Sequence, residues 1–167
     1  MRIFSFVIAF LFCGVGITNA TPWGMAKNAT IDIDDGQLSF CLPTPDSKGV
    51  AIDSVWVTEN KISNGGEQTV WDVEILPGAT PVILNPNECL KYGAILPGYK
   101  ENIPAKKLVA GVVYNFRLNR LLADARRTDV LFYTVVFCPV ASNGDVRYLA
   151  YVVEESGRVV KPPCDGD

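Results

Sequence analysis

Short stretches of alternating apolar and polar residues, each ended by a turn signal, constrain the fold of this chain most strongly. The clearest is 69–76, where Trp71, Val73 and Ile75 occupy one side and acidic residues the other. A period of two is typical of a half-buried β-strand, because successive side chains of a strand point to opposite faces of the sheet. A Pro-Gly pair then breaks the pattern.

Eight to ten stretches of this kind follow one another along the chain, and no stretch has the pattern of a long helix. We therefore predict an all-β fold, an immunoglobulin-like β-sandwich of about eight short antiparallel strands, with a small barrel as the alternative. Asp35-Gly36 and Asn143-Gly144 predict tight hairpins. The expected strands cover 29–34, 37–42, 52–59, 69–76, 82–84, 88–92, 112–118, 130–138, 146–153 and 158–161.

Two stretches between these strands have a different character. Residues 95–109 contain two prolines, a Pro-Gly turn and two adjacent lysines, and we expect a long exposed loop there. Residues 119–129 have no strand pattern and are expected to form a loop or one to two helical turns. Trp56 and Trp71 lie inside expected strands, so we place both in the core.

The first 20 residues have the layout of a cleaved secretory signal. Arg2 supplies a positive start, 3–17 carry no charge, and the segment ends in Thr18-Asn19-Ala20. An apolar run of 15 residues is short of the roughly 20 that a spanning helix needs. We expect cleavage after Ala20, a single domain over 21–167 and no membrane span. Cys13 follows a bulky Phe and is a poor lipid acceptor, so we expect no lipid anchor.

Composition favours a binding protein over an enzyme. Without 1–20 the chain keeps 14 of its 15 Lys and Arg and all 18 Asp and Glu, so its charge is −4 and no nucleic acid partner is expected. The sequence has no histidine, which removes the commonest general base and the commonest metal ligand. No P-loop, nucleophile elbow or zinc-protease motif is present. We expect no catalytic residues, no cofactor and no metal.

Four cysteines remain after cleavage: Cys41, Cys89, Cys138 and Cys164. An even number in an exported protein predicts two disulfides. No two of the four lie close enough in sequence to match a zinc motif. The sequence by itself leaves all three pairings open.

Three segments together resemble a known family. They are Gln37–Cys41, Asn85–Gly93 with its Asn-Pro-Asn-Glu-Cys-Leu-Lys-Tyr-Gly run, and Leu108–Tyr114. This set resembles the periplasmic proteins and lipoproteins of Gram-negative bacteria that act as type VI secretion immunity proteins, over roughly residues 29–118. Many members of that family are lipoproteins, whereas this chain has no usable lipidation site.

The resemblance implies a periplasmic protein that neutralises a cognate effector toxin, with a phospholipase as the first expectation for the effector. It also implies that Cys41 pairs with Cys89, which leaves Cys138 for Cys164. The alternative function is a secreted adhesin, a pilus-associated protein or a carbohydrate-binding β-sandwich.

We place the partner-binding residues in the 119–129 segment. Its two leucines would form an apolar centre and its three arginines a charged rim, and arginine is enriched at protein interfaces. Solvated loop residues are the alternative interpretation of the same segment. The candidate contacts are Arg120, Leu121, Leu122, Arg126 and Arg127.

Overall fold

The structure is a computed structural model of the whole chain. It describes residues 25–34, 36–43, 49–61, 66–86, 88–123, 129–142, 145–154, 156 and 158–164. The expected signal peptide lies outside these ranges, as do Arg126 and Arg127.

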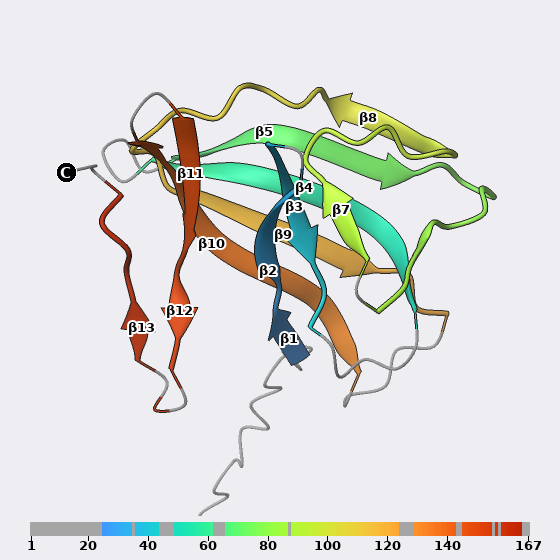
Figure 1. Cartoon of the computed structure of the whole chain (residues 1–167). Coiled ribbons are helices and arrows are strands. Elements are labelled where there is room, and N and C mark those ends of the chain that lie inside the picture. Colours follow the sequence, from blue (N-terminus) through green and yellow to red (C-terminus); the bar gives the residue numbers. More distant parts are fainter. Residues whose placement is uncertain are drawn as a thin grey trace, which may run out of the picture.

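All the regular secondary structure of the described residues is β-strand, arranged in one large sheet, one small sheet and a two-stranded ribbon (Figure 1). The large sheet has the order β1 (Met25–Asn28), β10 (Val130–Ser142), β9 (Tyr114–Arg120), β4 (Val50–Lys61), β5 (Gly66–Ile75) and β8 (Tyr99–Ile103). Two further strands join it outside this order: β11 (Asp145–Ala150) pairs with β10, and β6 (Ile83–Leu84) pairs with β4. The small sheet is β2 (Thr30–Asp34), β3 (Gln37–Cys41) and β7 (Cys89–Lys91), and the ribbon is β12 (Val152–Val153) and β13 (Val159–Val160).

The core lies between the two sheets, because the small sheet packs across one face of the large one (Figure 1). Phe40 of β3 stacks on Phe116 of β9 with 3.8 Å between ring centroids, and meets Phe137 of β10 edge-on at 5.5 Å. Such aromatic pairs contribute about 0.5–1.5 kcal/mol each beyond the area that they bury. Val55 and Val57 of β4 are fully buried beside them, as expected for a central strand. We call the face that covers this core the inner face of the large sheet, and the opposite face the outer face.

The structure confirms an all-β fold with two packed sheets. Both predicted hairpins are present, because Asp34 pairs with Gln37 and Ser142 pairs with Asp145. The expectation that every pairing is antiparallel is wrong in one place, where β1 runs parallel to β10. After β1 the chain passes through the buried Ala29, whose amide still donates to the Thr134 carbonyl of β10, and enters the small sheet at β2. The immunoglobulin-like strand order stays a prediction.

The two stretches expected to lack strands both contribute to the large sheet. The expected loop over 95–109 contains β8, which pairs with β5 from Tyr99 to Ile103. The expected loop or helix over 119–129 begins inside β9, which continues to Arg120. In both cases the pairing strand is distant in sequence, so the local pattern of residues does not show it.

Candidate partner-binding surface

Arg120, the first of the candidate contacts, is fixed within the fold. It lies opposite Ile52 of β4, and its Nη1 donates a hydrogen bond to the Val130 carbonyl, 3.1 Å away. Its Nε is buried without a hydrogen-bond partner. The guanidinium therefore joins the end of β9 to the start of β10. A partner contact by Arg120 stays a prediction.

Leu121 is the most exposed of the candidates whose placement the structure describes, with 41% of its surface accessible, whereas Leu122 is partly buried. The Leu121 amide donates to the Ala51 carbonyl at 2.9 Å. Ala51 pairs on its other side with Ile83 of β6, which is 46% exposed. Leu121, Ala51 and Ile83 thus form a partly exposed apolar row across three segments, which we call the Leu121 row.

An arginine enclosed by two aromatic rings lies on the outer face. Trp56 of β4 lies opposite Arg117 of β9. Phe132 of β10 lies opposite Asn119, which is two residues after Arg117 and points to the same face of the sheet. The Arg117 Cζ atom lies 3.7 Å from the Phe132 ring centroid and 5.2 Å from that of Trp56. Both distances are within the range of cation–π attraction, which contributes about 0.5–1 kcal/mol at exposed sites. We call Trp56, Arg117 and Phe132 the aromatic–arginine stack.

The position of Trp56 corrects the expectation that both strand tryptophans are core residues. Trp71 is fully buried on the inner face, as expected, but Trp56 is only partly buried. In β4 the inner face is already filled by Val55 and Val57, and alternation places Trp56 between them on the other face.

A chain of hydrogen bonds holds Arg117 in place. Its Nε donates to Asn119 Oδ1 at 3.1 Å, and Asn119 Nδ2 donates to Ser54 Oγ at 2.9 Å. Ser54 Oγ in turn donates to Asp53 Oδ2 at 3.0 Å. Partial burial lowers the pKa of Arg117, but an arginine side chain stays charged in proteins.

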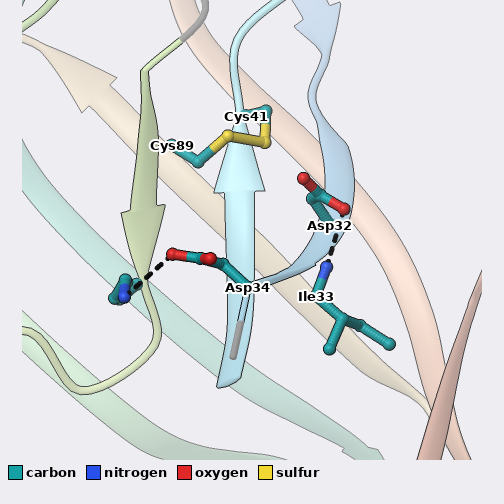
Figure 2. The surroundings of a disulfide bond; sticks show 6 residues. Asp32, Ile33, Asp34, Cys41 and Cys89 are labelled. Atoms are coloured by element: carbon teal, nitrogen blue, oxygen red, sulfur yellow. Dashed lines mark hydrogen bonds and ion pairs between the residues drawn. A yellow bond between two sulfur atoms is a disulfide. The ribbon is translucent and has the colours of Figure 1, made fainter. Parts of the chain in front are cut away.

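The disulfides pair as the resemblance implied, Cys41 with Cys89 and Cys138 with Cys164. Figure 2 shows the first, which joins directly opposite residues of β3 and β7 whose Cα atoms are 4.1 Å apart. The second attaches the segment after β13 to β10, 26 residues earlier in the chain. Each disulfide therefore fixes one element to a strand distant in sequence.

Asp32 lies beside the Cys41–Cys89 disulfide (Figure 2), with its carboxylate and the two sulfurs all within 4.8 Å of one another. Three such groups resemble a metal site. The sulfurs, however, are bonded to each other, and a metal requires the free thiolate. The two cysteines therefore form a covalent connection within the small sheet. The ion pair between Lys91 and Asp34, at 3.0 Å, joins strands of the same sheet.

The connection from β7 to β8 carries a second apolar feature, which is not among the residues predicted from the sequence. Ile95 is 94% exposed and borders a small hollow on the surface. The hollow is lined by Val73, Ala94, Ile95, Leu96, Tyr99 and Glu101. Residues 94–97 are all apolar in the sequence, and this run is the signal that indicates the feature at the start of the expected 95–109 loop.

Comparisons with protein-family models, with curated proteins and with solved structures found no match to this chain. Among the described residues, no helix is long and apolar enough to cross a membrane.

Proposed function

We propose that this protein is a periplasmic immunity protein that binds a cognate type VI secretion effector and blocks it by steric occlusion, without catalysis. The observation that supports this best is the continuity of two surface features. Arg117, Asn119 and Leu121 occupy alternate positions along one side of β9 and its end, so the Leu121 row continues from the aromatic–arginine stack. Trp and Arg are the residues that most often dominate the energetics of protein interfaces.

The compartment and the kind of partner rest on other support. Disulfides persist in oxidising compartments such as the periplasm, and the chain has two. The first 20 residues have the pattern of a secretory signal. The effector partner, and a phospholipase activity for it, come from the family resemblance alone.

The aromatic–arginine stack counts against the carbohydrate-binding alternative. Sugar rings stack on the open faces of aromatic side chains, whereas here the Arg117 guanidinium covers the face of Phe132 at 3.7 Å. A mixed surface of aromatic, cationic and aliphatic side chains is more typical of a protein interface.

The proposed function predicts that a gene beside this one encodes the effector, and the test uses that gene's product as the partner. A specific complex should bury at least about 1,000 Å² in total. We predict that Leu121→Asp together with Ile83→Asp weakens binding at least tenfold, because the complex would then desolvate two charges without partners, at a cost of a few kcal/mol. Calorimetry measures the affinity, and a survival assay against the effector measures protection.

Ile95→Asp is the matched control, because Ile95 is also an exposed apolar residue but lies in the connection from β7 to β8, where it borders the hollow. It should bind and protect like the unaltered protein. If the Leu121–Ile83 variant binds and protects fully, this surface is wrong. If the unaltered protein does not bind the effector, the proposed function is wrong.

A further inference from the structure

We propose that Arg117 is the receptor for a carboxylate of the partner protein, an Asp or Glu side chain on the effector's surface. This inference rests on the proposed function and specifies which chemistry the partner brings to the outer face. It follows from three properties of Arg117: donors that no described residue uses, no ion pair with a described carboxylate, and a rigid setting.

The terminal nitrogens of Arg117 are free to bind a ligand. A guanidinium has five N–H donors, and in Arg117 only the Nε–H is used within the protein, by Asn119 at 3.1 Å. The remaining donors have no hydrogen-bond acceptor among the described residues. Their planar fork matches the two oxygens of a carboxylate, which it binds through two parallel hydrogen bonds.

Arg117 also has no counter-charge in the part of the chain that the structure describes. No carboxylate of the described chain forms an ion pair with it, and the carboxylate of its hydrogen-bond chain, Asp53, acts only through Ser54 and Asn119. The side chain is partly buried, and removing a charge from water without a partner has a free-energy cost. A carboxylate from outside would offset that cost, which makes this position complementary to an anionic group.

The setting of Arg117 is rigid before binding. Two rings flank the guanidinium and Asn119 holds its Nε, so few rotamers remain to be lost when a ligand arrives. Fixing a long side chain on association usually costs about 0.5–1.5 kcal/mol, and here most of that cost is already met in the folded protein.

The surroundings favour a carboxylate on a protein over a small free acid. Arg117 does not line the hollow formed by Val73, Leu96, Tyr99 and their neighbours. It lies on a sheet face, where a small acid would be held by one charged group and by little else. A protein carboxylate arrives with additional surface that covers the Leu121 row at the end of the same strand.

The experiment measures the affinity of the neighbouring-gene effector for Arg117→Met, Arg117→Lys and the unaltered protein. Arg117→Met keeps an apolar stem between the rings and removes the charge, so the fold should survive. We expect at least a thirtyfold loss of affinity for this variant, since truncating one partner of a buried, hydrogen-bonded charge pair costs about 2–5 kcal/mol. Arg117→Lys keeps the charge without the fork, and a smaller loss is expected.

Arg147→Ala is the control, because Arg147 is an exposed arginine on β11, opposite Val140 at the far end of β10. The affinity of this variant for the effector should equal that of the unaltered protein. Substituting the effector's surface Asp and Glu residues by Asn and Gln should identify one whose loss adds little to that of Arg117→Met, as a double-mutant cycle requires for a direct contact.

The outcomes separate this inference from the function on which it rests. A complex that forms normally with folded Arg117→Met overturns the carboxylate contact and leaves the function standing. A loss with Arg117→Met that no effector carboxylate reproduces also overturns it. If the unaltered protein forms no complex, the function and the contact are both wrong.

Discussion

At the scale of single residues, Tyr99 connects three segments of the large sheet. Its hydroxyl donates to the Ile52 carbonyl at 2.5 Å and accepts a hydrogen bond from the Val82 amide at 3.2 Å. Partial burial raises the pKa of Tyr99, so the neutral phenol is the form that makes these bonds. The edge strand β8 is thereby fixed to the beginning of β4, beside the Leu121 row.

We predict that Tyr99→Phe lowers the free energy of unfolding by about 1–3 kcal/mol, because it leaves a backbone amide and a carbonyl without their partner. Urea unfolding measures the change. Tyr148→Phe is the matched control, since the Tyr148 hydroxyl has no hydrogen-bond partner among the described residues. It should change stability much less. Equal changes in the two variants would mean that the two hydrogen bonds of the Tyr99 hydroxyl add nothing to stability, which would contradict this prediction.

The burial of a single residue could be predicted from the sequence where apolar and polar residues alternate, because the apolar side faces the core. It could not be predicted where both sides of a strand are apolar. Trp71 lies in a cleanly alternating stretch, and its burial was predictable. Trp56 lies in a stretch that is apolar on both sides, so alternation could not say which side faces the core. The enclosure of Arg117 by two rings depends on the register of β4, β9 and β10, which no local pattern reveals.

At the scale of elements, each of the two disulfides fixes a segment to a strand that is distant in sequence. Cys41–Cys89 joins two strands of the small sheet, and Cys138–Cys164 attaches the end of the described chain to β10. The loops that they close have sequence separations of 48 and 26 residues. In the chain-entropy model such loops contribute about 4 and 3.5 kcal/mol.

We predict that replacing Cys41 and Cys89 together by Ser lowers the free energy of unfolding by about 2–5 kcal/mol, the usual range for native disulfides in small exported domains. Chemical denaturation of the variant and the unaltered protein measures the difference. Peptide mapping without reductant provides the check on pairing. A peptide that joins Cys41 to Cys138 would contradict the arrangement described here.

The tight hairpins could be predicted from the sequence, whereas the strand β8 could not. Asp35-Gly36 specifies a tight turn by its own chemistry, and Gly36 indeed has a φ of +74°, which glycine adopts without strain. The residues of β8 are mostly polar and follow a Pro-Gly turn, so they resemble a loop. They become a strand because β5 presents a free edge, a property of the assembled sheet.

At the scale of the whole molecule, the small sheet covers the inner face of the large sheet, and the proposed binding surface lies on the outer face. The inner face of the large sheet is occupied by the small sheet, and the outer face presents the aromatic–arginine stack and the Leu121 row. The strand content and the two-layer architecture were predictable from the periodic pattern. The candidate surface was predictable only in part, because Leu121 was named from sequence but Ile83, Trp56 and Arg117 join it through pairings distant in the chain.

Titration of the effector's activity tests the central claim, neutralisation by stoichiometric binding, most directly. The purified protein is added in steps to a fixed amount of the proposed effector, and the remaining activity is measured at each step. Occlusion predicts that activity falls linearly and stops at a fixed molar ratio, because each molecule blocks one partner and is not released for another. Complete loss of activity at substoichiometric amounts would show turnover and contradict the claim, as would activity unchanged by an excess of the protein.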